Sequence, residues 1–242
     1  MSVKITSRDN PIPSVNLLQL SGATPFGVGG RRLCFVHPLD PAKCVKVLRQ
    51  DTGRTVRDYS NFIPTRCRRE YDNNAHELKE LSALIQRLGS KAAQCLPRCY
   101  GMSETDLGPG LVLDLIRDFD GHISLSLREL ISKGTPPAEL RPAYDELGAF
   151  LLKHTVLTRA LLDHNIVAQN CGKAQWRLYI IDGYGDPAWV PIARILRPLA
   201  RSKIQRRLAE LWPKLEQLAQ HPVTQELVQG STWGQGFLSH RG

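Results

Sequence analysis

Two short apolar segments in the second half of the chain, residues 166–168 and 176–181, are separated by a polar stretch at residues 170–173. Apolar runs of this length around a turn predict a β-hairpin. Asn165 comes directly before the first segment, and Asp182 directly follows the second. Since the strands of a hairpin start and end at the same edge, we expect these two oxygen-bearing side chains to lie near each other. Asn and Asp are also common at hairpin ends for turn reasons alone, so this segment needs support from the rest of the chain.

The composition is that of a globular protein that is long enough for one larger domain or for two lobes that share a cleft. The chain has 242 residues, of which 42% are hydrophobic and 23% are charged. No run approaches the roughly 18 apolar residues of a membrane helix, and residues 1–9 lack the apolar region of a secretory signal. The six cysteines form no Cys-x-x-Cys pair beside a His cluster. We therefore expect free thiols, a cytoplasmic location and no integral membrane segment.

The net charge of +9 is unevenly distributed. Residues 31–69 contain ten Lys or Arg against three acids, and residues 194–207 contain six Lys or Arg and no acid. A basic surface attracts polyanions, although such charge also serves solubility alone. An anionic substrate is therefore one expectation. Nucleic acid is not favoured, because there is no interleaved aromatic pattern, zinc finger or RNA-binding signature.

The N-terminal part predicts an antiparallel sheet that contains a glycine-rich turn. Apolar segments at residues 15–20, 33–36 and 44–48 predict strands, and the first two flank the segment Pro25-Phe26-Gly27-Val28-Gly29-Gly30. Glycines such as Gly27 and Gly29 let backbone N–H groups approach phosphates closely, because no Cβ intervenes. Glycines in hairpins are also simple turn formers, so this motif alone is weak.

Lys46 is more informative, because it lies within an apolar run. A Lys there needs an anionic partner, unless it points to solvent from an edge strand. The spacing of leucines predicts a helix at residues 75–89, with a start signal at residues 71–74. Glu77 lies beside the apolar stripe of that helix and could reach Lys46; Glu70 or Glu80 could do so instead, and most helix glutamates simply face water.

The remaining elements follow in a simple order. We expect a surface loop at residues 50–70, a hairpin from residues 97–104 and 110–116, a crossover at residues 118–121, a helix at residues 136–159, the hairpin described above, a turn or short helix at residues 191–199, an amphipathic helix at residues 204–218 and a loose tail from residue 230.

Taken in order, these parts resemble a protein-kinase-like fold, and several segments closely resemble the YrbL-type PhoP regulatory network family of bacteria. The resemblance spans residues 20–212 and rests on Pro25-Phe26-Gly27-x-Gly29, Cys34-Phe35-Val36-His37-Pro38, Cys44-Val45-Lys46-Val47, Asp118-Phe119-Asp120-Gly121, Asn165-Ile166 and Ile181-Asp182. It implies an α+β, two-lobed protein-kinase-like fold. The N-lobe, residues 14–117, would hold an antiparallel sheet with one helix. The C-lobe, residues 118–229, would be reduced and mainly helical, and residues 230–242 would form a flexible tail.

The resemblance also implies roles for individual residues, with ATP and Mg²⁺ as cofactors. Lys46 would reach the α- and β-phosphates, and Glu77 would orient Lys46. The other implied roles are phosphate cover by Gly27 and Gly29, metal binding by Asn165 and Asp182, and backbone contacts to adenine by residues 113–120, which include Asp118. The family name links the chain to a two-component regulatory network, but it supplies no established reaction.

The match breaks at the catalytic base. In kinases an Asp lies five residues before the metal-binding Asn, and this position is Ala160 here. Asp163 or Asp186 could act in an unusual geometry, and Asp163 is our catalytic candidate beside Lys46, but loss of ordinary kinase chemistry is the favoured interpretation. Only 60 residues follow Asp182, without an Ala-Pro-Glu motif. This argues against a conventional protein kinase and suits a small-molecule or lipopolysaccharide-type kinase, or a nucleotide-binding regulator.

The leading expectation is therefore a cytoplasmic kinase-like protein that binds ATP and Mg²⁺, with phosphate transfer to an unknown acceptor left open. The alternative is a pseudokinase that acts by binding a protein partner. A basic nucleic-acid-associated regulator is the third hypothesis.

Overall fold

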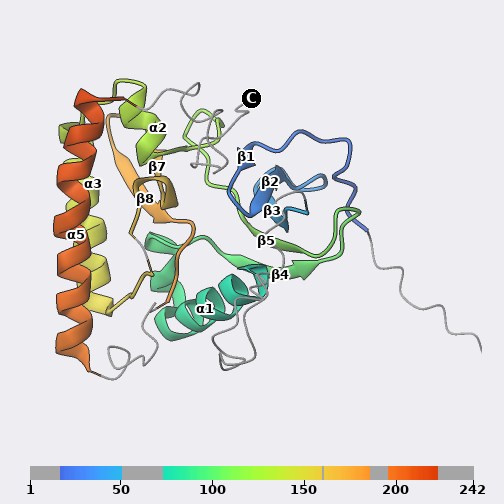
Figure 1. Ribbon diagram of the computed structural model, residues 1–242, viewed down its shortest axis with the longest axis horizontal. Helices are drawn as coiled ribbons and strands as arrows, with labels where there is room; N and C mark the ends of the chain where they lie inside the picture. The colour runs from blue at the N-terminus through green and yellow to red at the C-terminus, as the bar shows by residue number, and fades with distance from the viewer. Residues whose placement is uncertain (1–16, 51–72, 160, 186–195, 223–242) are drawn as a thin grey trace, which may run out of the picture.

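The computed structural model describes residues 17–50, 73–159, 161–185 and 196–222, which form a mixed α+β structure (Figure 1). A five-stranded sheet lies on one side of the molecule. A three-stranded sheet with helices α2, α3 and α5 lies on the other side (Figure 1). Both sheets are antiparallel. Among the described residues, no helix has the length and apolar character needed to cross a membrane.

The five-stranded sheet has the order β1-β2-β3-β5-β4. Its strands are β1 (Gly27–Val28), β2 (Arg32–Val36), β3 (Lys43–Leu48), β4 (Cys99–Ser103) and β5 (Gly110–Asp114). The strands expected at residues 33–36 and 44–48 and the hairpin expected after residue 97 are confirmed. β3 is central, between β2 and β5, so Lys46 does not lie on an edge strand.

Strand alternation assigns the two faces of β3 to different parts of the core. Val45 and Val47 pack in a small cluster with Leu18, Leu20, Phe35 and Val112. Cys44 belongs to the main core on the opposite face. Lys46 therefore shares the face of Cys44, which is the face covered by helix α1.

The strand expected at residues 15–20 is wrong for the part of it that the structure describes. Leu18 forms a single isolated bridge with Thr105 instead of a strand ladder. The reason is a competing anchor at the β4–β5 turn, where the carboxylate of Asp106 accepts hydrogen bonds from the backbone N–H groups of Leu20 and Ser21 at 2.7 and 3.0 Å. These contacts hold the segment against the turn.

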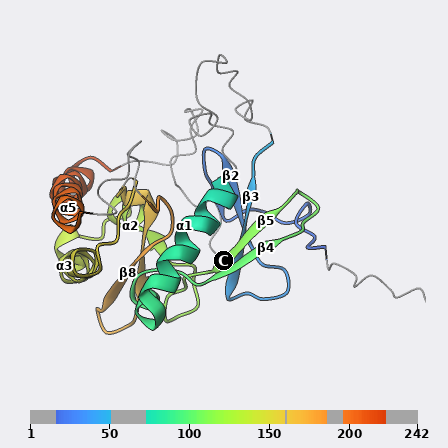
Figure 2. The same ribbon diagram turned by 90° about the horizontal axis from the view of Figure 1, so that it is seen from below.

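Helix α1 (Asn73–Leu88) confirms the helix expected at residues 75–89 and begins two residues earlier. It lies across the five-stranded sheet (Figure 2) and contacts β3, β4 and β5. Leu81 of α1 is fully buried. The side chain of Asn74 donates to the carbonyl of Lys46 at 2.7 Å, which fixes the first turn of the helix to the central strand. The 3₁₀ helix η2 (Gly89–Gln94) follows.

The three-stranded sheet consists of β6 (Leu125–Ser126), β7 (Ile166–Asn170) and β8 (Trp176–Ile180). The hairpin expected from the two apolar segments is thus confirmed, with Ile166 paired to Ile180. Helix α2 (Leu127–Ser132), which sequence analysis missed, starts with a capping box formed by Ser126 and Glu129.

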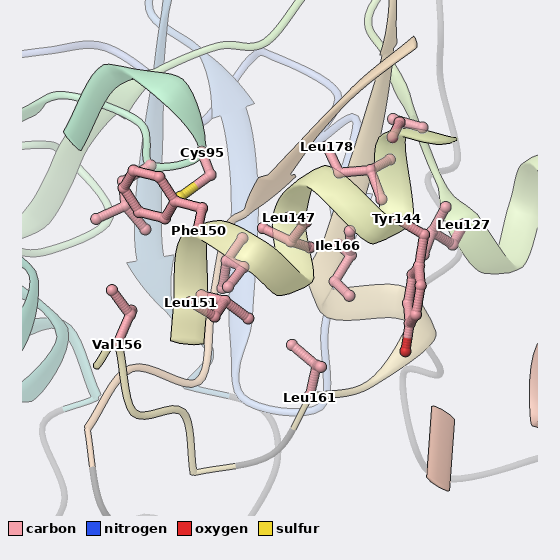
Figure 3. Packing of buried hydrophobic residues seen from close by; sticks show 14 of the residues in the cluster. Cys95, Leu127, Tyr144, Leu147, Phe150, Leu151, Val156, Leu161, Ile166 and Leu178 are labelled. Carbon is pink, nitrogen blue, oxygen red and sulfur yellow. The ribbon is translucent and has the colours of Figure 1, made fainter. Parts of the chain in front are cut away.

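Helix α3 (Pro137–His154) packs its apolar face on this sheet (Figure 3). Leu147 and Leu151 of α3 lie in one core cluster with Ile166 of β7 and Leu178 of β8. The expected helix at residues 136–159 is five residues too long, because Thr155 adopts a left-handed conformation with φ of 51° that ends the helix.

The long helix α5 (Arg197–Gln220) lies beside α3 and closes the outer side of the molecule (Figures 1 and 2). The expected helix at residues 204–218 is confirmed and is longer than expected. The ring of Tyr144 on α3 lies 4.9 Å from that of Trp212 on α5, and the Tyr144 hydroxyl donates to the carbonyl of Leu208 at 2.7 Å.

Several expectations lie wholly or partly outside the described residues. They concern the loop at residues 50–70, the helix start signal at residues 71 and 72, the residues Ala160 and Asp186, most of the expected turn at residues 191–199 and the tail at residues 230–242.

We predict that Gly110→Ala destabilises the five-stranded sheet. A Cβ at Gly110 would lie 2.5 Å from Cγ1 of Val45 and 3.2 Å from Cγ1 of Val47, both in the core. Such overpacking costs about 1–3 kcal/mol in the free energy of unfolding, which urea denaturation measures.

Gly22→Ala is the matched control, because a Cβ there would meet no atom within 4 Å. Equal unfolding free energies for the two variants would contradict the packing of β5 against β3.

Candidate functional site

A buried ion pair joins β3 to α1. The Nζ atom of Lys46 lies 2.8 Å from Oε1 of Glu77, and the two residues are 6% and 3% exposed. Lys46 also donates to the carbonyl of Ile181 at 2.7 Å, next to the end of β8. Glu77 is thus the carboxylate that meets Lys46, and the pair reaches from the five-stranded sheet to the β7–β8 hairpin.

Arg32 at the start of β2 is the second cation of this group. Its side chain is buried, with the residue 8% exposed. One terminal guanidinium nitrogen donates to Oε2 of Glu77, and the other terminal nitrogen donates to Oδ2 of Asp182 at 2.5 Å. Arg32 thus bridges α1 and the segment after β8. We call Arg32, Lys46, Glu77 and Asp182 the charge cluster.

Asp182 is the open member of the charge cluster, with its side chain 42% exposed. Its Oδ1 accepts the N–H of Gly183 at 2.6 Å. Although desolvation raises the pKa of Asp182, the nearby Arg32 and Lys46 cations bring it well below its usual range. Burial and Arg32 lower the pKa of Lys46, but Glu77 and Asp182 raise it above its usual value overall. Both groups are therefore charged at neutral pH.

A hollow of about 280 Å³ opens beside the charge cluster. Its walls include Arg32, Glu77, Asp182 and the glycines of the β1–β2 turn, Gly29 and Gly30. The N–H of Gly29 donates to the carbonyl of Arg32 at 2.8 Å, and a Cβ at Gly29 would lie 3.3 Å from that oxygen. Of the two glycines that the sequence suggested as phosphate cover, Gly29 lines the hollow. Gly27 lies in β1, paired with Cys34.

Asn165 lies at the end of η3 (Asp163–Asn165), directly before β7. Its carbonyl accepts the N–H of Ile181 at 2.9 Å. The backbone of Asn165 therefore stands opposite the residue before Asp182, at one edge of the hairpin, as the sequence pattern indicated.

Asp163 has a different environment. Its carboxylate accepts hydrogen bonds from two guanidinium nitrogens of Arg128 on α2, at 2.8 and 2.7 Å, and lies 3.2 Å from Nδ1 of His164. Although burial raises the pKa of Asp163, the hydrogen bonds and charges of His164 and Arg128 bring it well below its usual range. Asp163 lines a separate hollow with residues of α5, including Leu211 and Lys214. The structure does not bring it into the charge cluster.

Asp118 is engaged within the protein. Its Oδ1 accepts the hydroxyl of Ser124 at 2.5 Å and the N–H of Asn170 at 2.9 Å. These contacts tie the connection between β5 and β6 to the end of β7. In the stretch proposed to contact adenine, the N–H groups of Asp114 and Leu115 already donate to the carbonyls of Arg98 and Ala42.

Sequence analysis missed Arg32. Alternation places Arg32 on the same face of β2 as Cys34, and Cys34 pairs directly with Lys46, so both cations face α1. The sequence does show a basic residue two positions before Cys34. That Arg32 lies near Lys46 follows only from the β2–β3 register, which the sequence does not specify.

We predict that Asp163→Asn lowers the free energy of unfolding by about 2–3 kcal/mol at pH 7. Because its folded-state pKa is depressed, the contribution of Asp163 is complete above its ordinary pKa of about 4 and fades as the pH falls below that value. Urea denaturation should therefore show a smaller difference between wild type and variant at pH 3 than at pH 7.

Asp145→Asn is the control, because Asp145 pairs with Arg141 on the exposed face of α3 and should contribute less than about 1 kcal/mol. An equal effect of both substitutions at pH 7 would contradict a special role for the Asp163–Arg128 pair.

Comparison with known proteins places the chain in a family. The family model for the PhoP regulatory network protein YrbL matches residues 18–216. Protein YrbL of Escherichia coli (strain K12) is 30% identical over 183 residues, which cover 73% of this chain and 78% of that protein. Protein YrbL of Shigella flexneri matches with the same identity and coverage. The matched range contains the whole charge cluster and Asn165, and the chain belongs to the PhoP regulatory network protein YrbL family.

Proposed function

We propose that the protein is a kinase-like protein that binds ATP with Mg²⁺, with the nucleotide phosphates between the five-stranded sheet and the β7–β8 hairpin. One observation carries the proposal. The buried Lys46 is held by Glu77 on α1 and lies against the backbone that leads to Asp182. A strand lysine, a helix carboxylate and an aspartate after a strand pair are the parts with which kinases hold nucleotide phosphates and metal.

The order of the elements supports a two-lobed, protein-kinase-like fold. An antiparallel five-stranded sheet with one helix precedes a mainly helical part that contains a short hairpin. We assign the N-lobe to residues 14–117 and the C-lobe to residues 118–229. The boundary lies in the connection between β5 and β6, where Asp118 anchors the chain to Asn170.

The residues at the hairpin edge fit Mg²⁺. This ion favours oxygen ligands and is commonly held by one or two carboxylates together with substrate phosphates. Asp182 has a partly exposed carboxylate, and Asn165, whose backbone lies at the same end of the hairpin, would supply an amide oxygen. The described residues contain no group of three or more His, Cys, Asp or Glu that could hold a metal by itself. The sparse donor set suits a metal that shares its ligands with phosphates, whose charge it would neutralise.

The chain's own residues would orient the nucleotide. Lys46 would donate to the α- and β-phosphates, and Glu77 would keep its ammonium group in place. Gly29 and Gly30 would allow the β1–β2 turn to approach the phosphates, since no side chain intervenes. Such a site belongs in the cytoplasm, where ATP is present and thiols stay reduced; the five described cysteines are free.

Phosphate transfer by this protein would proceed without the usual catalytic base. Ala160 occupies the position of the usual base, and Asp163 is engaged by Arg128. We therefore assign Asp163 a positioning role in the loop before β7. Transfer could still proceed through positioning and electrostatic stabilisation of the transferred group. The acceptor would be anionic or of a small-molecule or lipopolysaccharide type.

A pseudokinase that binds a protein partner is the second candidate, and a basic hollow favours it. A space of about 580 Å³ between α1, the end of α3 and the start of α5 is lined by Arg87, Lys153, Arg197 and Arg201, with Leu84 among its apolar residues. An acidic segment with an apolar side chain would complement this surface. The family name links such a partner to the PhoP network.

We predict that saturating Mg-ATP raises the melting temperature of the wild type. Ligand at 100 times its dissociation constant stabilises a protein by about 2.7 kcal/mol, which corresponds to about 5–10 °C for a chain of this size. Asp182→Ala should abolish most of the increase, because the metal would lose its carboxylate. Differential scanning fluorimetry measures both results.

Asp145→Asn serves as the control and should respond like the wild type. A wild-type melting temperature that does not change with Mg-ATP would contradict the proposal. ATP consumption by the wild type that is lost in Asp182→Ala would separate an enzyme from the pure binding module.

A further inference from the structure

Arg32 is the one member of the charge cluster that the proposed ATP–Mg²⁺ site does not use. Its guanidinium contacts the carboxylate that the metal would need, at 2.5 Å from Oδ2 of Asp182. The other oxygen of that carboxylate accepts the N–H of Gly183. Both oxygens of Asp182 therefore already accept hydrogen bonds from within the protein.

The charge cluster is also electrically balanced. It contains two cations, Arg32 and Lys46, and two carboxylates, Glu77 and Asp182. A divalent cation arriving alone at Asp182 would lie beside the guanidinium and the ammonium and would be repelled by both. The free protein should thus bind Mg²⁺ weakly.

A phosphate group meets the opposite situation. The hollow of about 280 Å³ is lined by the glycines of the β1–β2 turn and by more cations than carboxylates: Arg31, Arg32 and Arg159 against Glu77 and Asp182. A guanidinium has five N–H donors and can bind phosphate through two of them, which makes phosphate a strong competitor of Asp182 for Arg32. A phosphate drawn to Arg32 would leave Asp182 without its cation.

We propose that Arg32 is a phosphate-binding residue of this site and that it sets the order of binding. A terminal phosphate enters the hollow first and draws Arg32 away from Asp182. The released carboxylate then takes the metal. This inference rests on the proposed function and adds a direct role for a residue of β2.

The test is Arg32→Gln, studied by isothermal titration calorimetry with two separate ligands. Removing the guanidinium should strengthen binding of MgCl₂ alone by about tenfold, since Asp182 is freed. It should weaken binding of ATP in the presence of EDTA by about tenfold, since a charged hydrogen-bond donor is lost. A merely structural role for Arg32 would weaken both.

Arg98→Gln is the charge-matched control, because the side chain of Arg98 is exposed and Arg98 is not among the residues that line the hollow. It should change both affinities much less than Arg32→Gln. If Arg32→Gln fails to fold, as judged by circular dichroism, Arg32→Lys keeps a positive charge without the bidentate fork. It should then show the same two opposite effects in smaller size.

The outcomes separate the inference from the proposed function. If the wild type binds Mg-ATP but the Arg32 variants change the affinities for both ligands in the same direction, or match Arg98→Gln, the role of Arg32 is overturned and the nucleotide site stands. If the wild type binds neither Mg-ATP nor metal-free ATP, the proposed function fails, and this inference fails with it.

Discussion

The site is organised around a single carboxylate, that of Glu77, which accepts hydrogen bonds from two cations in the interior of the protein. Lys46 reaches it from β3, and Arg32 reaches it from β2. Removing one partner of a buried pair typically costs about 3–5 kcal/mol, because a charge is left uncompensated. Each of these residues therefore depends on the others, and together with the Asn74–Lys46 hydrogen bond they fix α1 over the sheet.

Stability alone does not explain such a group. Buried ion pairs can often be replaced by apolar residues of similar volume without loss of stability, because desolvation offsets much of the attraction. An apolar core is already present on the same side of the sheet, around Leu81 and Leu111. Clusters of charged groups with shifted pKa values beside a hollow are instead typical of binding and catalytic sites. The open side chain of Asp182 gives this cluster its contact with the surroundings.

The sequence was sufficient to predict the elements in which apolar residues follow a regular spacing. The leucine spacing of α1 and the apolar pair around Asn165 and Asp182 predicted a helix and a hairpin that the structure confirms. The pairing of Lys46 with Glu77 remained one of several choices, because helix rotation over a sheet depends on packing. The end of α3 was missed, because the left-handed turn at Thr155 needs no glycine and leaves no signal in the sequence.

The candidate site could be predicted only in part, because a set of motifs specifies neither the strand register nor the orientation of the side chains. Arg32 belongs to the charge cluster because of the β2–β3 register. Asp163 lies outside the cluster and pairs with Arg128, a residue of a helix that had not been predicted. Both are effects of tertiary structure on charged side chains. Charged side chains can pair across long sequence separations, here 150 residues between Arg32 and Asp182.

A crystal structure with Mg²⁺ and a non-hydrolysable ATP analogue would test the central claim most directly. The account predicts a phosphate oxygen at about 3 Å from Nζ of Lys46, with Arg32 turned from Asp182 towards phosphate and the metal bound to Asp182. An analogue bound elsewhere, with the Arg32–Asp182 contact intact, would contradict it.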